Sequence, residues 1–257
     1  MTDNAQQDEQ KGEPKGERIA KVMARAGLAS RRGAERMIAD GRVKVDGVQL
    51  DTPAFLVTPD NVIVVDGTTI GAPDRTRMWL YNKPVGLIVS HGDPEGRPTV
   101  FDAMPRDMPR VISVGRLDLS SEGLLLLTNN GALAQFLEHP STGWTRHYRV
   151  RGYGVPSERK LEQIRKGATV DGIRYAPAVI EDEQGGRTNR WYTIAIKEGK
   201  NREIRRLMNF ADVQVSRLLR TSFGPFQLGS LQEGELKEIP KKVLMEQLGT
   251  NAEKFDF

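Results

Sequence analysis

Cysteine is absent from the sequence and histidine is scarce, and both facts limit the chemistry that the protein can perform. None of the 257 residues is cysteine, which excludes disulfides, thiol nucleophiles and thiolate metal sites. The three histidines, His91, His139 and His147, are scattered, so we expect no bound metal. A chain without cysteine fits a reducing compartment, and we expect a cytoplasmic protein.

Long apolar segments and a strong charge imbalance are missing too. No apolar run approaches the roughly 20 residues that span a bilayer, and the run Leu124–Leu127 reads as a short buried segment. Residues 1–16 lack the apolar core of a signal peptide, so we expect no membrane association. Lys and Arg number 38 against 34 for Asp and Glu, a net charge of +4, so the position of the cations matters more than their excess.

The length of the chain suggests two modest domains, and its composition changes accordingly. Residues 1–17 are polar and predict a disordered tail. Residues 18–70 form one unit, and residues 71–76 have the composition of a linker. Residues 77–240 form a larger unit, and we expect residues 241–257 to be a C-terminal tail with a short helix and a frayed end.

Hydrophobic periodicity predicts an α+β protein. In the first unit, apolar residues recur at helical spacing before Gly27 and again after Ser30, which stands in an N-cap position. Asp-Gly pairs at 46–47 and 66–67 then indicate tight turns between short strands. The second unit shows strand patterns at 78–81, 111–114, 148–150 and 191–196 and helix patterns at 131–138, 157–166 and 202–210. This mixture predicts a mixed, largely antiparallel sheet flanked by helices.

The first unit carries a cluster of basic residues. Arg31 and Arg32 fall in the first turn of the second helix, where free backbone N–H groups favour a phosphate, and Arg36 and Lys44 add charge nearby. Charge alone leaves a solvated basic surface equally open. The sequence Ala-Gly-Leu-Ala-Ser-Arg-Arg at 26–32, with Gly-Arg-Val-Lys-Val-Asp-Gly at 41–47, resembles the S4 RNA-binding domain. That resemblance implies an RNA ligand but no particular activity.

The most informative stretch surrounds Asp118, which follows an expected strand and precedes the buried run of leucines. A carboxylate held at such a strand end can face a cleft and act as a nucleophile or base. The same pattern also fits an aspartate that caps a turn or pairs with Arg116. With Glu122, which we expect to be a solvated loop residue, it fits the carboxylate pair of a glycosidase. The residues of this stretch alone leave these alternatives open.

Several motifs in fixed order resemble the RsuA-type pseudouridine synthases, a family of bacterial ribosomal RNA enzymes. The matching segments are Gly115–Thr128, Asn-Lys-Pro-Val-Gly at 82–86 with 93–99, His-Pro at 139–140, Arg-His-Tyr-Arg-Val at 146–150, Glu-Gly-Lys-Asn-Arg-Glu-Ile-Arg-Arg-Leu at 198–207, and 217–225. The resemblance covers residues 18 to about 240, and an S4 domain ahead of the catalytic domain is the family's own arrangement. Ser121 stands where the family often has Thr, and Arg146 where it usually has Lys.

The resemblance implies that a uridine is flipped out of the RNA, detached from its ribose and rejoined through C5. Asp118 would act on the ribose, either by attacking C1′ or by taking the 2′ proton. Arg205 matches the cation that pairs with it, and Tyr148 matches the tyrosine that stacks on the base. Leu218 matches an apolar pocket residue, and Arg116 would hold a phosphate or fill the space of the extruded base. A core tyrosine, a core leucine and a phosphate-binding arginine are the alternatives for Tyr148, Leu218 and Arg205.

The remaining expectations concern partners. Arg146 and Arg202 complete the expected substrate-binding residues, within a basic run that also contains Lys200, Arg206, Arg217 and Arg220. The reaction includes no redox step or hydrolysis, so no cofactor is expected. The expected partner of a monomeric enzyme is ribosomal RNA, or a pre-ribosomal particle, with the large subunit ahead of the small one. The alternative is a non-catalytic S4-type assembly factor, which would leave the motifs of the second unit unexplained.

Overall fold

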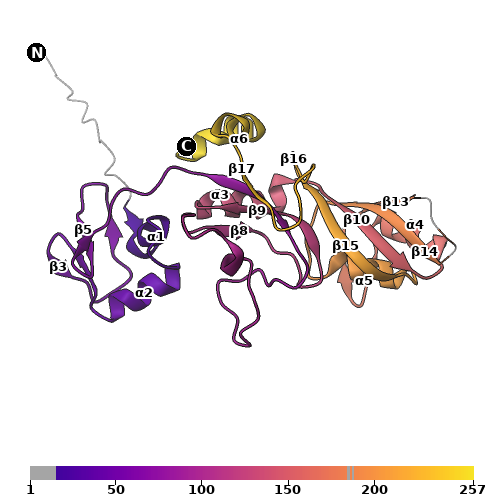
Figure 1. Cartoon of the computed structure of the whole chain (residues 1–257), viewed down its shortest axis with the longest axis horizontal. Helices are drawn as coiled ribbons and strands as arrows, with labels where there is room; N and C mark the ends of the chain where they lie inside the picture. The colour runs from indigo at the N-terminus through magenta and orange to yellow at the C-terminus, as the bar shows by residue number, and fades with distance from the viewer. Residues whose placement is uncertain (1–15, 184–185, 187) are drawn as a thin grey trace, which may run out of the picture. The chain divides into compact units, whose positions relative to one another are not determined.

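The computed structural model describes residues 16–183, 186 and 188–257, which divide into two compact units between Asp74 and Arg75 (Figure 1). Most of the expected tail, residues 1–15, lies outside the described residues, and Glu17 already belongs to a strand. Residues 71–76 contain no helix or strand. Thr76 is buried within the second unit and accepts a hydrogen bond from Asn130 Nδ2 at 2.7 Å.

The first unit packs two helices against short strands. The helices are α1 (Ile19–Arg25) and α2 (Arg31–Ala39), and the hydroxyl of Ser30 caps α2 by accepting from Gly33 N at 3.0 Å. The strands are β1 (Glu17–Arg18), β2 (Val43–Val45), β3 (Val48–Gln49), β4 (Leu56–Val57), β5 (Ile63–Val65) and β6 (Thr68–Thr69). They pair as β3-β2-β5-β6 and β1-β4. The two helices confirm the predicted helix pair, and the hairpins β2-β3 and β5-β6 confirm both Asp-Gly turns.

The second unit contains a nine-stranded sheet. Its main path runs β13 (Val179–Glu183), β14 (Asn189–Ile196), β10 (Arg146–Tyr153), β15 (Gln214–Phe223), β9 (Glu122–Thr128), β7 (Met78–Lys83) and β17 (Leu236–Glu238). Strand β16 (Phe226–Gln227) pairs with β15, and β8 (Ile112–Val114) pairs with β9. Only β15 and β9 pair in parallel among the described strands of this sheet, which confirms the predicted mixed, largely antiparallel arrangement.

The parallel contact between β9 and β15 depends on Gly123. Its φ of +98° is rare for residues with a side chain, and a Cβ there would lie 2.4 Å from the carbonyl oxygen of Arg220. Glycine therefore lets the start of β9 approach the middle of β15, which joins the two halves of the sheet at the level of residue 122.

Helices cover the sheet on both faces. They are α3 (Gly131–Glu138), α4 (Glu158–Lys166), α5 (Glu203–Phe210) and α6 (Lys241–Leu248), accompanied by the short elements η1 (Phe101–Ala103), η2 (Pro140–Thr142), β11 (Thr169–Val170), β12 (Ile173–Arg174) and η3 (Gly249–Lys254). Figure 1 shows α3 beside β8 and β9, α4 beside β13 and β14, and α5 beside β15. None of the helices described is long and apolar enough to cross a membrane.

The side chains of β9 divide the core of this unit into two clusters. Leu125 and Leu127 point into the cluster that contains α4 and α5, whereas Leu124 and Leu126 point into the cluster that contains α3 and α6. Alternation of this kind follows from the two-residue period of a strand. The leucine run of the sequence is therefore a central strand buried on both faces, directly after the loop that carries Asp118.

Residues 241–257, expected to be a tail, belong to the folded second unit. Leu244 and Leu248 lie on one face of α6 and are buried with Ala252 of η3. Close to the C-terminus, the carbonyl of Asp256 accepts from the backbone N–H of Thr76 at 2.5 Å. Leu244 and Leu248 are four residues apart and therefore lie on the same face of α6, which packs against the core.

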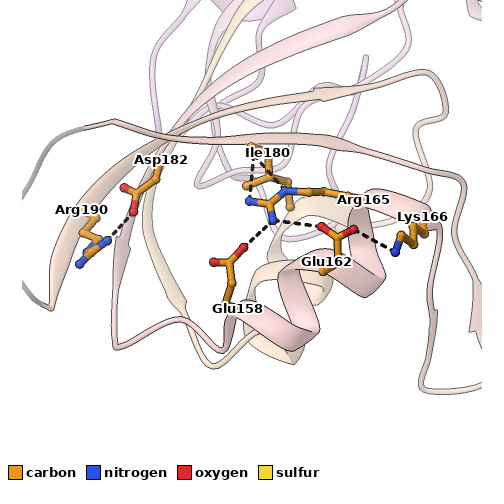
Figure 2. Close-up of polar contacts among 7 residues, drawn as sticks. All are labelled: Glu158, Glu162, Arg165, Lys166, Ile180, Asp182 and Arg190. Atoms are coloured by element: carbon orange, nitrogen blue, oxygen red, sulfur yellow. Dashed lines mark hydrogen bonds and ion pairs between the residues drawn. The ribbon is translucent and has the colours of Figure 1, made fainter.

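Polar contacts also attach α4 to the neighbouring strand β13 (Figure 2). Arg165 donates to the carbonyl oxygen of Ile180 at 3.3 and 3.4 Å and pairs with Glu158 at 2.6 Å. Exposed pairs of this kind contribute at most about 1 kcal/mol. Burial of Leu161 and Ile164 therefore holds the helix, and the charges orient it.

Candidate active site

Asp118 lies on the loop of residues 115–121, here called the Asp118 loop, which connects the neighbouring strands β8 and β9. The side chain of Asp118 is 33% exposed, whereas that of Leu117 is buried and anchors the loop. The loop turns at Gly115, which has a φ of +67° and donates its N–H to Glu138 Oε1 at 2.7 Å. Asp118 thus stands in the middle of a short loop between two strands rather than at a strand end, and it is partly exposed. The loop is fixed to the core through Leu117 and to α3 through Gly115.

Four consecutive carbonyl groups hold the Asp118 loop in place. The hydrogen bonds are Ser121 N to Asp118 O (3.0 Å), Gly86 N to Leu119 O (2.8 Å), Arg205 Nη2 to Ser120 O (3.0 Å) and Lys83 Nζ to Ser121 O (2.8 Å). Three of the four donors come from outside the loop, on β7, the turn after it and α5. A carboxylate on such a loop is held in one place before substrate arrives, as catalysis by positioning requires.

Lys83 is a buried cation behind this loop. Its side chain is fully buried, and its ammonium group donates to the carbonyl oxygens of Pro84 and Ser121, both at 2.8 Å. Burial lowers the pKa of Lys83 to about 8, and the nearby negative charges of Asp118 and Glu122 oppose that change. The sequence motif at 82–86 contains this lysine, but no feature of the pattern indicated that it reaches the Asp118 loop.

Arg202, rather than Arg205, makes the ion pair with Asp118. Arg202 Nη1 lies 3.7 Å from Asp118 Oδ2, and Arg202 is the N-cap of α5, with a φ of +51°. Arg205, expected to pair with the aspartate, instead donates to the carbonyl oxygens of Ser120 and Val215, the latter at 3.1 Å. Burial, reinforced by Arg202, lowers the pKa of Arg205, although Asp118 opposes this. Arg202 therefore places a positive charge beside Asp118, and Arg205 holds the loop that carries it.

A cavity of about 400 Å³ opens beside Asp118, a size suited to a small ligand. Tyr148 on β10 and Leu218 on β15 line it and are almost completely buried. Tyr148 lies opposite Arg220 in the sheet register and Val150 opposite Leu218, so Tyr148, Leu218 and Arg220 face the same side. A second hollow of about 760 Å³ shares residues 115–118 with the first and extends the opening. The structure thus brings the expected Asp118, Tyr148, Leu218 and Arg116 together.

Two further arginines contribute to the cavity wall. The guanidinium of Arg146 lies 4.5 Å from the centre of the Phe223 ring and donates to Lys197 O at 2.9 Å, and burial lowers its pKa. Arg220, expected in a basic run near the cleft, lines the cavity but is only 2% exposed, and its Nε donates to Leu124 O at 2.7 Å. Its place opposite Tyr148 on a central strand explains the burial, which the count of basic residues could not show.

Glu122 has a different position from the expected solvated loop. It is the first residue of β9, is buried, and forms an ion pair with Arg217. Among the described residues the cavity walls include Asp118 but not Glu122. A pair of free carboxylates flanking one substrate, as a glycosidase needs, therefore does not form from these two residues.

The four expected RNA-binding residues of the first unit are exposed. Arg31 and Arg32 lie in the first turn of α2, and Arg36 and Lys44 are also exposed. None of these four forms an ion pair within the described residues, in contrast to Arg42, which pairs with Asp66. They are therefore available to RNA phosphates. Across the same part of the chain, no cluster of three or more acidic or histidine side chains could hold a metal ion.

Comparisons with known proteins agree with this division of the chain. The S4 domain family matches residues 17–63, and the RNA pseudouridylate synthase family matches residues 77–210. An uncharacterized RNA pseudouridine synthase of Rickettsia prowazekii is 45% identical over 231 residues, which cover 90% of this chain and 97% of the relative.

Other relatives carry a more specific name. Ribosomal large subunit pseudouridine synthase B is 41% identical in Pseudomonas aeruginosa, where the match covers 92% of this chain and 64% of the relative. It is also 41% identical in Yersinia pestis, with 89% and 74% covered. A crystal structure of a pseudouridylate synthase, 23% identical, superposes with a TM-score of 0.63 over 90% of this chain and 99% of the other, and so shares its fold.

Proposed function

Because the chain belongs to the RNA pseudouridylate synthase family, we propose that it isomerises one specific uridine of large-subunit ribosomal RNA, with Asp118 as the catalytic carboxylate. The resemblance to pseudouridine synthases and to the S4 domain is confirmed by these family matches. The relatives named large subunit pseudouridine synthase B support the choice of RNA. The observation that carries the choice of residue is a partly exposed Asp118, held by its loop at the wall of a cavity.

The cavity is suited to a flipped nucleotide. A uridine inside folded RNA must leave its stack to be reached, which costs a few kcal/mol. Tyr148 offers a flat ring beside Asp118, on which the base can stack with little loss of side-chain entropy. Leu218 adds an apolar surface next to the ring. Stacking and apolar contact together offset the cost of flipping, and they hold the base while it is detached.

The chemistry requires Asp118 to carry negative charge when it meets the ribose. The bond from N1 to C1′ breaks, the uracil turns, and C5 bonds to C1′ before its proton leaves. Asp118 acts on C1′ directly or on the 2′ proton. The guanidinium of Arg202, 3.7 Å from the carboxylate of Asp118, stabilises its negative charge, and the buried ammonium group of Lys83 adds a second positive charge near it. Arg116 and Arg146, at the same cavity, are placed to contact the phosphate and sugar of the flipped nucleotide.

The first unit extends the grip on RNA beyond one nucleotide. Its exposed cations, Arg31, Arg32, Arg36 and Lys44, suit the phosphate backbone of a folded RNA. Uridine occurs at very many positions in ribosomal RNA, and the cavity holds only one nucleotide. Selection of one uridine therefore needs contacts outside the cavity. We assign that contribution to the S4 unit.

Mapping of pseudouridine in ribosomal RNA tests this function. Total RNA from cells with and without the gene is compared at single-nucleotide resolution, and the deletion is complemented with the wild-type chain. We expect one large-subunit uridine to lose its modification and to regain it on complementation. Loss of a pseudouridine from small-subunit RNA instead would show that the small subunit is the substrate. An unchanged map would support a non-catalytic RNA-binding protein.

A further inference from the structure

A buried carboxylate that the reaction does not use lies in the wall of the same cavity. Glu203, the first residue of α5, is 3% exposed. Its Oε2 accepts from Lys200 N at 2.8 Å, but its Oε1 has no hydrogen-bond partner among the residues described. A buried carboxylate oxygen without a donor is costly, so this group needs either a proton or a partner.

A second carboxylate, Glu198, lines the same cavity and is a candidate partner of Glu203. Its carboxyl group contacts the ammonium group of Lys200 at 2.8 Å, and Lys200 is the residue whose backbone N–H binds Glu203. The carboxyl group of Glu198 also accepts from Ala176 N at 2.7 Å. Two ionised carboxylates cannot hydrogen-bond to each other, whereas a carboxylic acid and a carboxylate can.

The ionisation of the two groups fits one shared proton. Burial, reinforced by the charge of Glu198, raises the pKa of Glu203 to about 7, against the hydrogen bond from Lys200. Burial also works against ionisation of Glu198, but hydrogen bonds from Lys200 and Ala176 outweigh it and lower the pKa of Glu198. The environments thus push the two carboxyl groups apart, so that one proton resides on the pair near neutrality.

We propose that Glu198 and Glu203 share one proton and that this acid pair positions Arg202 beside Asp118. The pair closes the segment 199–202 from both ends, and Glu203 N donates to Lys200 O at 3.1 Å within it. Arg202 needs such support because its φ of +51° is a conformation that residues with side chains rarely adopt. The proposal rests on Asp118 as the catalytic carboxylate, since it treats the acid pair as acting only through Arg202.

Removal of the shared proton would open the segment. Two adjacent anions repel each other, and the ammonium group of Lys200 pairs with Glu198, whereas Glu203 accepts from the backbone N–H of Lys200. The negative charge of Glu203 also acts on Arg146 of β10, whose pKa it raises against the effect of burial. The other ionisable groups along the cavity are Arg116, Asp118, Glu138, Tyr148, Lys197, Arg202 and Arg220. As the pH rises through the pKa of Glu203, Arg202 therefore loses its position and the rate of isomerisation falls.

The test uses the full-length protein and release of the C5 hydrogen from tritium-labelled ribosomal RNA under single-turnover conditions. Glu203→Gln keeps the shape of the neutral acid, and Glu203→Ala removes the group. Glu162→Gln, on the surface of α4, is the matched control. We expect Glu203→Ala to lose on the order of 10- to 100-fold in turnover with RNA affinity retained. Glu203→Gln restores most of that loss and moves the alkaline fall in rate to higher pH, and the control behaves as wild type.

A second measurement separates the acid pair from Lys83, which titrates at a similar pH. Hydrogen exchange of the segment 199–202, corrected for intrinsic rates, is compared at about pH 6 and about pH 9. We expect exchange to increase at the higher pH in the wild type but not in Glu203→Gln.

Two results would overturn the proposal: coincident pH–rate profiles of wild type and Glu203→Gln, or exchange in that segment that ignores pH in both. A wild-type chain that modifies no ribosomal RNA would refute the proposed function instead. The exchange measurement would still show whether the acid pair closes the segment.

Discussion

Replacement of Lys83 by methionine should separate the stability of the second unit from its activity. Lys83 is fully buried, and its pKa falls from the ordinary 10.5 to about 8. At about 1.4 kcal/mol for each factor of ten in proton affinity, holding the charged form costs about 3 kcal/mol. Methionine has a similar length and no charge. It removes this cost but leaves the carbonyl oxygens of Pro84 and Ser121 without their donor, a loss of about 1–3 kcal/mol.

The sign of the pH dependence follows from the lowered pKa. Between pH 8 and 10.5 the unfolded chain still binds the proton that the folded chain has released, so folding becomes more favourable as the pH rises. The gain is complete above 10.5 and is lost as the pH falls through about 8. Relative to Lys83→Met, the wild type should therefore gain about 3 kcal/mol of unfolding free energy between neutral pH and about pH 10.5.

Urea unfolding followed by tryptophan fluorescence measures this difference. All three tryptophans, Trp79, Trp144 and Trp191, lie in the second unit, so the signal reports on the unit that contains Lys83. At neutral pH the variant should unfold near the wild-type midpoint, yet isomerise uridine on the order of 10- to 100-fold more slowly because its Asp118 loop is less firmly held. Stability curves that stay parallel across this pH range, or full activity in the variant, would refute the role assigned to the buried lysine.

Three further variants, one of them a double substitution, test the fold, the binding of RNA and the alternative chemistry of paired carboxylates. Gly123→Ala should lower the unfolding free energy by about 3 kcal/mol or more, because its Cβ would enter the backbone of β15 at a positive φ, and an unchanged urea midpoint would contradict this. Arg31→Ala with Arg32→Ala should weaken RNA binding and reduce the log–log salt slope by up to about 2, whereas unchanged affinity for long RNA would remove the S4 unit from the binding account. Glu122→Gln should retain isomerisation, because Glu122 pairs with Arg217 outside the cavity, and its complete inactivation would revive the paired-carboxylate reading.

Local pattern predicted the elements of the fold well. The helix at 131–138 has the bounds that periodicity gave, and the helices at 157–166 and 202–210 begin one residue later than expected. Ser30 caps α2, and both Asp-Gly turns form. These features depend on residues close together in the chain. The position of Asp118 after β8 and before β9 was predictable for the same reason.

Partners across the fold were not predictable from spacing. The choice of Arg202 over Arg205 depends on where α5 begins and on which carbonyls lie in front of its first turn. The pairing of Glu122 with Arg217 depends on the parallel contact of β9 with β15, about a hundred residues apart. Lys83 lies opposite Gly123 of the same strand, so its burial depends on the same assembly. No periodic signal in one segment reports on contacts of this kind.

The most direct test of the account is the rate of Asp118→Asn. Asparagine keeps the size and most hydrogen bonds of aspartate but cannot supply the negative charge or act on the ribose. In a single-turnover assay on ribosomal RNA that the wild type modifies, the variant should bind RNA with wild-type affinity and lose at least about 1,000-fold in isomerisation. An Asp118→Asn protein that makes pseudouridine at the wild-type rate would show that the catalytic group lies elsewhere.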